Sequence, residues 1–203
     1  MSKPARKDGS LSREHFMLRE FRLVADLKHQ GVSDADIIAA AKDDNLFQYP
    51  TTSESARVAR TMLLRLEALQ DDALVAHAAT ALKEQAAQIN LYAMMRSYAL
   101  VEQFMIQEIG QRISTLDYHI SRADILSFLA RYQATNPDAA TFAEATVKRI
   151  AGVLMECLCE VGYLANTRSE DLIPLIIEPT LEDVIKKNND HQMLSAFSCL
   201  EVL

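Results

Sequence analysis

The stretch of residues 87–109 limits the folds open to this chain more than any other. Its spacing predicts a single helix, and apolar residues recur on nearly every side of that helix. These residues are Ile89, Leu91, Tyr92, Met94, Met95, Tyr98, Leu100, Val101, Phe104, Met105, Ile106 and Ile109. A helix that is apolar all round must be covered by other elements, so we expect it at the centre of a helical bundle. Polar residues interrupt the run often enough that we expect no membrane insertion.

Residues that break helices are scarce along the whole chain. Five Gly and five Pro in 203 residues, with frequent Ala and Leu, predict an all-α fold. Helix start and stop signals divide the chain into about eight helices of a multi-helix bundle. We expect a flexible basic arm at residues 1–11, a three-helix subdomain that resembles a helix-turn-helix at 12–70, and a C-terminal helical subdomain at 71–203.

The N-terminal subdomain is expected to hold three helices in close succession. Ser12 and Ser33 stand where N-cap residues belong, and they predict helices over residues 12–30 and 34–44. Residues 51–69 form the third helix. The connection at residues 45–50 is longer than the usual turn of about three or four residues in a helix-turn-helix.

The third of these helices is predicted to have one buried face and one cationic face. Thr51 and Glu54 have the spacing of a capping box at its start. The apolar stripe consists of Val58, Met62, Leu66 and Leu69. The opposite side carries Ser53, Arg57 and Arg60, as a rotation of about 100° per residue requires. Residues 51–69 are therefore a candidate recognition helix, and a cationic face that is simply solvated is the alternative.

Two further arginines fall where burial is expected. Arg65 lies closer to the apolar stripe than Arg57 does, so we interpret it as a buried ion-pair partner rather than a ligand contact. Arg96 lies on the apolar helix at the centre of the chain. Because a buried cation is costly without a counter-charge, we expect Arg96 to have a carboxylate partner.

The second half of the chain has the element order of a winged helix. Thr141 and Glu144 have capping-box spacing and open a helix that Gly162 ends. A polar tip at residues 166–171 and an apolar run at 172–177 then predict a small β-hairpin wing at residues 163–177. Its ligand contacts would be Lys148, Arg149 and Arg168. A structural role for the wing is the alternative, because carboxylates in its tip would repel phosphate.

The sequence contains no recognisable set of catalytic residues. It has neither a Gly-rich phosphate loop nor a nucleophile motif of the hydrolases. The five His do not share a helix face and the three Cys include no CxxC pair, so we expect no metal and no cofactor. The first residues lack the apolar core of a signal peptide, which predicts a cytoplasmic protein with reduced thiols. We therefore expect a protein that is not an enzyme.

Charge is distributed unevenly along the chain. The formal net charge is −7, yet residues 1–65 hold eleven Lys and Arg against nine Asp and Glu, a net charge of +2. Residues 66–203 hold the acidic remainder, so an anionic partner should meet the N-terminal third. The residues expected to contact DNA phosphate are Lys3, Arg6, Lys7, Arg19, Ser53, Arg57 and Arg60.

An ordered set of short segments resembles the BrxA family of bacterial BREX (bacteriophage exclusion) defence systems. The segments are Leu18-Arg19-Glu20, Asp44-Asn45-Leu46, Arg57 with Arg65-Leu66, Tyr92 with Arg96 and Tyr98, and Glu160-Val161-Gly162-Tyr163-Leu164. The likeness covers residues 13–179. The resemblance implies an all-helical protein similar to the antitermination factor NusB, with a non-enzymatic accessory role in phage resistance. It also implies that double-stranded DNA and other BREX proteins are its partners.

Three hypotheses on function stay open from the sequence. The first is a protein that binds double-stranded DNA, mainly through phosphate, with the N-terminal basic residues. The second is a protein-interaction module that helps to assemble the defence complex, which the acidic second part and the half-apolar tail favour. The third is RNA binding of the NusB kind, which rests on the family resemblance alone.

Overall fold

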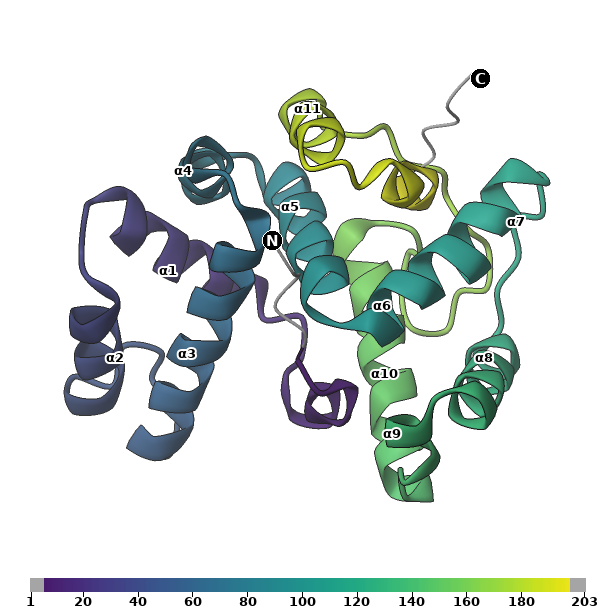
Figure 1. Ribbon diagram of the computed structural model, residues 1–203, viewed down its shortest axis with the longest axis horizontal. Helices are drawn as coiled ribbons and strands as arrows, with labels where there is room; N and C mark the ends of the chain where they lie inside the picture. Colours follow the sequence, from purple (N-terminus) through teal and green to yellow (C-terminus); the bar gives the residue numbers. More distant parts are fainter. Residues whose placement is uncertain (1–5, 198–203) are drawn as a thin grey trace.

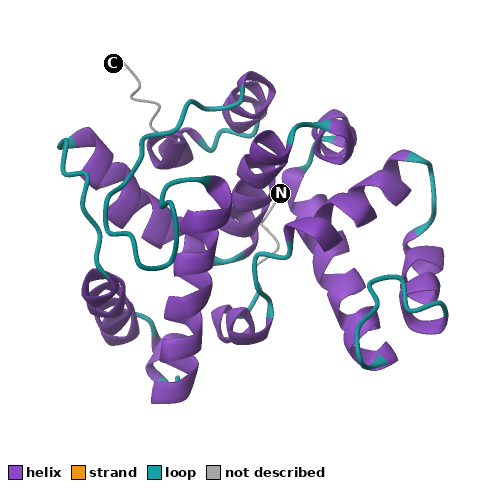
Figure 2. Ribbon diagram, turned by 180° about the vertical axis from the view of Figure 1, so that it is seen from behind, coloured by secondary structure: helices purple, strands orange, loops and turns teal. Residues whose placement is uncertain are grey.

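The computed structural model describes residues 6–197 as an all-α bundle with no β-strand in that part of the chain (Figures 1 and 2). Its α-helices are α1 (Leu18–His29), α2 (Asp34–Asp43), α3 (Thr52–Leu69), α4 (Asp72–Thr80), α5 (Lys83–Ser97), α6 (Ala99–Phe104), α7 (Gln111–Ser114), α8 (Arg122–Thr135), α9 (Pro137–Ala140), α10 (Glu144–Val161) and α11 (Pro179–Lys187). Two 3-10 helices, η1 (Asp8–Arg13) and η3 (His191–Phe197), and a π-helix, η2 (Met105–Gly110), complete them. The bundle thus has more helices than the eight expected. No helix of the described residues is long and apolar enough to cross a membrane.

Helix α5 occupies the centre of the bundle, as its all-round apolar pattern predicted. Residues 86–97 are all buried, and α1, α3, α4 and α10 pack around them (Figure 1). The single long helix expected over residues 87–109 is wrong, however, because Tyr98 has extended backbone angles that separate α5 from α6. Asp8 of η1 stabilises the start of α6, since its Oδ1 accepts from the Leu100 backbone nitrogen at 3.1 Å.

The helix expected to start at Ser12 is also different. Residues 8–13 form η1, and α1 begins only at Leu18, after Met17 in the left-handed region (φ 51°). Between η1 and α1 the chain passes alongside α3. Arg57 and Arg65 of α3 donate to backbone carbonyl oxygens of this segment, which would otherwise accept hydrogen bonds within a helix. The Ser12 hydroxyl donates to the Gly9 carbonyl oxygen within η1 instead of capping α1.

The β-hairpin wing expected at residues 163–177 is wrong. In the described residues this segment forms one isolated bridge, between His119 and Asp171, and otherwise runs as irregular chain. The capping box expected at residue 141 is wrong as well, because α10 begins at Glu144 with Ala143 as its N-cap. The Thr141 hydroxyl donates to the Asp138 carbonyl oxygen at the end of α9 instead. An apolar run after a helix therefore does not suffice for a wing, because its backbone finds no neighbouring strand.

Two helix starts lie where the sequence predicted them, at Ser33 and Thr51. Each of these side chains accepts from a backbone nitrogen three residues later and begins α2 or α3, and Asp71 and Ser121 begin α4 and α8 in the same way. Arg96 has the expected carboxylate partner, because its Nη1 lies 2.9 Å from Asp190 Oδ2. In the N-terminal part, α2 packs on α3 across the connection at residues 44–51, and α1 packs on both α3 and α4.

Candidate nucleic-acid interface

One edge of α3 holds the chain segment that leads from η1 into α1. Arg57, Thr61 and Arg65 follow one another at intervals of four residues, so they line one side of the helix. Arg57 Nη1 donates to the Arg13 carbonyl oxygen at 3.1 Å, and Thr61 Oγ1 donates to Glu14 Oε1 at 3.3 Å. The Arg65 guanidinium donates to the carbonyl oxygens of residues 14, 15 and 16 at 3.1, 2.8 and 2.8 Å. The segment therefore runs alongside α3, which fixes η1 beside its N-terminal half.

Arg65 is fully buried, as predicted, but its role differs in detail from the ion pair expected. Its direct partners are backbone carbonyls and the Asn90 side-chain oxygen, at 3.4 Å. The nearby carboxylate of Glu14 contributes electrostatically rather than by contact. Arg65 is thus a structural residue that orders the start of α1.

Glu14 ties the beginning of the described chain to this arrangement. Its carboxylate accepts hydrogen bonds from Arg6, Tyr98 and the Ser10 hydroxyl, the last at 2.8 Å. Burial raises the pKa of Glu14, but the hydrogen bonds from Tyr98 and Ser10 and the charges of Arg6 and Arg65 outweigh it, so the pKa lies below its ordinary value. The carboxylate is therefore ionised in the folded protein at neutral pH.

These contacts decide which residues of the expected basic arm are available to a ligand. Lys3 lies outside the described residues. Arg6 is paired with Glu14, lies over the Tyr98 ring and is only 20% exposed, so a phosphate would have to compete with that carboxylate. Lys7, the N-cap of η1, is exposed, and its side chain has no hydrogen bond or ion pair within residues 6–197.

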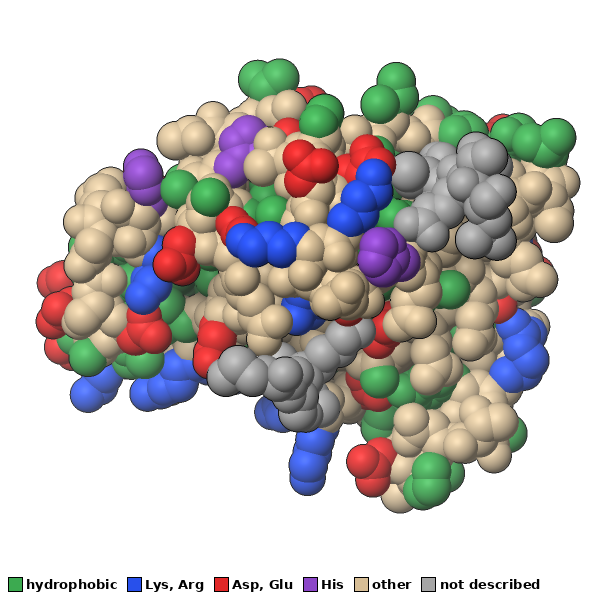
Figure 3. All heavy atoms as spheres, turned by 45° about the horizontal axis from the view of Figure 1, so that its top comes forward, with side chains coloured by type: hydrophobic (Ala, Val, Ile, Leu, Met, Phe, Trp, Pro, Cys, Tyr) green, Lys and Arg blue, Asp and Glu red, His purple; other side chains and the backbone are tan. Residues whose placement is uncertain are grey.

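Cations gather where the end of η1 is held to α3, because Arg57 of α3 donates to the Arg13 carbonyl oxygen and Arg60 lies about one turn further along α3. The N-terminal ends of α3 and α10 point to the same side of the molecule with η1 between them (Figures 1 and 2). We define the cationic face as Lys7, Arg13, Arg57 and Arg60. Lys and Arg side chains protrude along the lower edge of the view in Figure 3, beneath the half that holds α2, α3 and η1. The N-terminal dipole of the 18-residue helix α3 adds positive potential to this side.

The four cations differ in how free they are. The side chains of Arg13 and Arg60 are exposed and, like that of Lys7, make no hydrogen bond or ion pair within residues 6–197. Arg57 is 33% exposed. Its guanidinium donates to the Arg13 carbonyl oxygen at 3.1 Å and pairs with the Glu54 carboxylate at 3.5 Å. Ser53, on the first turn of α3, is exposed beside them. Arg13 was not predicted as a site residue, because the sequence pattern placed it inside a helix. The signal that could have indicated it is its position just after the expected basic arm.

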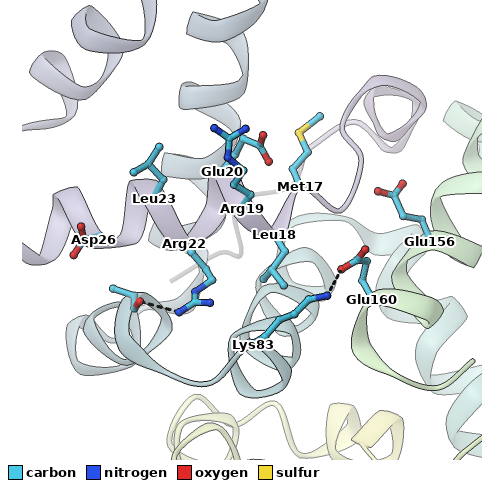
Figure 4. A pocket seen from close by; sticks show the side chains of 11 residues that line it. Met17, Leu18, Arg19, Glu20, Arg22, Leu23, Asp26, Lys83, Glu156 and Glu160 are labelled. Carbon is cyan, nitrogen blue, oxygen red and sulfur yellow. Dashed lines mark hydrogen bonds and ion pairs between the residues drawn. The ribbon is translucent and has the colours of Figure 1, made fainter. Parts of the chain in front are cut away.

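Arg19 lies apart from this group, on a groove of about 770 Å³ between α1, the start of α5 and α10 (Figure 4). Across the groove Lys83 pairs with Glu160 at 3.8 Å, and Arg22 donates to the carbonyl oxygens of Ala79 and Ala81. Figure 4 shows Arg19 beside Glu20 at the groove's edge. The lining carries both signs of charge, so the groove does not provide a continuous positive path for a phosphate backbone.

The second set of expected contacts is not brought together. Lys148 lies near the start of α10 and pairs with Glu144 at 2.5 Å, and Arg149 is exposed next to it. Arg168 follows the opposite end of α10, roughly 20 Å away at about 1.5 Å per residue. Lys148 and Arg149 thus lie near the start of α10, the helix that packs on η1, whereas Arg168 belongs to another part of the surface.

Other chemistry has little support in the described part of the chain. No group of three or more His, Cys, Asp or Glu there could hold a metal ion. Burial raises the pKa of the Cys157 thiol, so this thiol stays protonated and is a poor nucleophile.

Two carboxylates that anchor η1 are expected to give opposite pH dependences. Burial raises the pKa of Asp8 above 3.8 despite hydrogen bonds from Tyr132 and Leu100, so its contribution to stability is complete below that pH and is lost as the pH rises through the folded pKa. Glu14 has a lowered pKa, so its contribution is present above 4.5 and is lost as the pH falls through the folded pKa. In urea unfolding, the destabilisation caused by Glu14→Gln should shrink as the pH is lowered, and that caused by Asp8→Asn should grow. Parallel trends for the two variants would contradict this assignment.

Comparisons with known proteins bear on most of the chain. The BrxA family profile matches residues 8–189. The protein named BREX protein BrxA from Bacillus cereus strain H3081.97 is 26% identical over 149 residues, which cover 73% of this chain and 74% of that protein. An uncharacterized protein from Magnetospirillum magneticum, known from its crystal structure, has a similar fold. It matches with a TM-score of 0.75 at 19% identity over 95% of this chain and 98% of the other.

Proposed function

Because the chain belongs to the BrxA family of BREX phage-defence systems, we propose that it is a non-enzymatic accessory protein that binds double-stranded DNA, mainly through phosphate. The observation that supports this proposal most is the cationic face. Three of its four side chains are exposed without a protein partner in the described residues, and the fourth, Arg57, holds the backbone carbonyl of Arg13 beside α3. Such unneutralised cations are suited to phosphate oxygens.

The arrangement favours contact with the DNA backbone over reading of bases. Guanidinium and ammonium groups bind phosphate in any sequence, whereas base reading requires side chains placed in a groove. The formal net charge of −7 repels DNA from the rest of the surface. We therefore infer that the protein binds duplex DNA with moderate affinity, weak sequence preference and strong salt dependence. We also infer that it acts in the cytoplasm.

The test compares two variants that remove the same charge from different places. Arg13→Ala/Arg60→Ala removes two cations of the cationic face, and Arg122→Ala/Arg168→Ala removes two exposed arginines outside it, one at the start of α8 and one after the C-terminal end of α10. Fluorescence anisotropy with a duplex of mixed sequence should show binding weakened by roughly a hundredfold for the first pair, since charged hydrogen bonds contribute about 1.5 kcal/mol or more each. The second pair should bind nearly like wild type. Equal losses for both pairs would mean that the cationic face is not the site.

A substitution that removes a negative charge, and is expected to strengthen DNA binding, provides a second test. Glu54→Gln removes the carboxylate beside Arg57 and leaves the backbone nitrogen that Thr51 caps. Duplex binding should therefore strengthen severalfold. A structured RNA added as competitor distinguishes the NusB-like alternative, because an RNA that displaces the duplex at lower concentration than unlabelled DNA would favour RNA as the ligand.

A further inference from the structure

The segment at residues 170–183 combines apolar and acidic side chains in an unusual order. Its sequence is EDLIPLIIEPTLED, with five carboxylates and no Lys or Arg. The acidic pairs Glu170-Asp171 and Glu182-Asp183 stand at its two ends, and the apolar run lies between them. Leu172 of this run is buried and Leu175 and Ile177 are half-buried, so the members that remain exposed are informative.

The structure holds this segment at the surface with two isoleucines turned outward. Ile176 is 92% exposed and Ile173 is 49% exposed. The backbone beneath them is fixed: the Ile173 nitrogen donates to the Tyr163 carbonyl oxygen at 2.9 Å, and the Gln88 side chain donates to the Ile176 carbonyl oxygen at 3.0 Å. The same Gln88 amide accepts from the Glu178 nitrogen at 2.9 Å. The isoleucines are therefore displayed by an anchored segment.

A neighbouring loop extends the apolar surface. The Leu172 nitrogen donates to the Tyr118 carbonyl oxygen at 3.0 Å, which brings residues 116–120 against the segment. Leu116 in that loop is 72% exposed and Tyr118 is 40% exposed. Figure 3 shows hydrophobic side chains along the upper edge of the molecule, on the side away from the protruding cations. We define Leu116, Tyr118, Ile173 and Ile176 as the apolar ridge.

We propose that the apolar ridge docks a partner protein through a segment whose apolar side chains are flanked by Lys or Arg. Exposed apolar groups that gather on one face mark interaction sites, and carboxylates at the rim select the charge of the partner. Asp117, Glu170 and Asp171 are exposed around the ridge, and Asp183 is exposed beyond its far end. Against these four carboxylates the neighbouring chain offers two exposed arginines, Arg122 and Arg168, and Glu170 also pairs with His119 at 3.7 Å, so the rim keeps an excess of negative charge.

The position of the ridge makes this function compatible with DNA binding and independent of it. The segment at residues 170–183 comes after the C-terminal end of α10 and the loop at residues 116–120 packs against it, whereas the cationic face flanks the N-terminal end of α10. An 18-residue helix is about 27 Å long, so the two surfaces are separated by most of the molecule. One chain can thus hold DNA on one side and a basic, apolar protein segment on the other.

The experiment uses two labelled peptides that share a core of leucine and isoleucine alternating with serine. One carries two lysines at each end, and the other carries two glutamates at each end. Fluorescence anisotropy with the full chain should show the lysine peptide bound at least tenfold more tightly than the glutamate peptide. Ile173→Ser/Ile176→Ser should weaken the lysine peptide by about tenfold or more, without lowering the melting temperature, because both side chains are exposed.

Matched acidic variants separate a local site from general attraction to an acidic protein. Glu170→Gln/Asp171→Asn should weaken the lysine peptide severalfold, and Asp43→Asn/Asp44→Asn at the end of α2 should not. Equal effects of the two acidic pairs, or no effect of the isoleucine pair, would overturn the proposal. A wild-type dimer in light scattering that the isoleucine pair makes monomeric would also overturn it, in favour of a second copy of this chain. DNA binding should be unchanged in these ridge variants, so failure here is distinguishable from failure of the DNA proposal.

Discussion

Replacement of Arg65 by alanine is expected to lower the free energy of unfolding by about 4 kcal/mol. The substitution removes the donor for the carbonyl oxygens of residues 14 and 15, which lie against α3 in the interior. The carbonyl of Phe16 keeps a second donor, the Asn90 side chain, at 2.7 Å. Each orphaned buried acceptor costs about 1–3 kcal/mol, and loss of a fully buried long side chain adds a cavity.

Urea unfolding of Arg65→Ala and Arg60→Ala compares a buried and an exposed arginine on the same helix. Arg60→Ala should change stability by no more than about 0.5 kcal/mol, because its side chain has no protein partner in the described residues. Arg65→Lys should fall between the two variants, since one ammonium cannot satisfy all three carbonyl groups. A loss below about 1 kcal/mol for Arg65→Ala would mean that the segment at residues 13–16 does not depend on α3.

Replacement of Arg96 by methionine is expected to cost about 3–5 kcal/mol. Arg96 lies 2.9 Å from Asp190 Oδ2 and also donates to the Tyr92 hydroxyl and Gln70 Oε1, at 3.0 and 2.7 Å. Both members of the ion pair are buried, so removal of the guanidinium leaves a carboxylate in a low-dielectric site without its cation. The contact joins α5 to the end of α3 and to the connection before η3, so the loss affects three parts of the bundle.

The double variant Arg96→Met/Asp190→Leu distinguishes a needed ion pair from needed packing. Because two apolar groups of similar volume fill the site without desolvation of charge, the double variant should regain most of the stability that the single variant loses. Thermal unfolding of both variants checks this expectation. A double variant as unstable as Arg96→Met would show that the carboxylate is required for its own hydrogen bonds, among them the one from Tyr92 at 2.9 Å.

Local chemistry accounts for what could be predicted of the fold. The hydroxyls of Ser33 and Thr51 accept from a backbone nitrogen three residues later, so these two helix starts could be predicted from neighbouring residues. The all-round apolar pattern placed α5 at the centre, and the cost of a buried cation predicted the carboxylate beside Arg96. In each case the determining groups lie close together in sequence or follow from burial alone.

The errors arise where a distant side chain decides the local structure. Residues 14–16 do not continue a helix, because Arg65 binds their carbonyls from about 50 positions away. Tyr98 separates α5 from α6, where Asp8 supplies a hydrogen bond to the new helix start. The apolar run at residues 172–177 has the sequence pattern of a strand. Its backbone, however, bonds to the Gln88 side chain, which donates to the Ile176 carbonyl oxygen and accepts from the Glu178 nitrogen, and not to a neighbouring strand. Such long-range hydrogen bonds leave no local pattern in the sequence.

The candidate site was predictable only in part for the same reason. The exposed position of Arg60 follows from helical rotation, and the structure places it as expected. Arg6 looked like an equivalent basic residue, but Glu14, eight positions away, binds it. Arg13 joins the cationic face because its backbone is held by Arg57, a contact that spans 44 residues.

The salt dependence of duplex binding tests most directly whether the cationic face binds phosphate. Each phosphate contact contributes about 0.9 to the slope of log Kobs against log salt concentration, because its counterion is released. The slope should therefore be about 2 smaller in magnitude for Arg13→Ala/Arg60→Ala than for wild type, and unchanged for Arg122→Ala/Arg168→Ala. Equal slopes for wild type and Arg13→Ala/Arg60→Ala would contradict the assignment of DNA binding to this face.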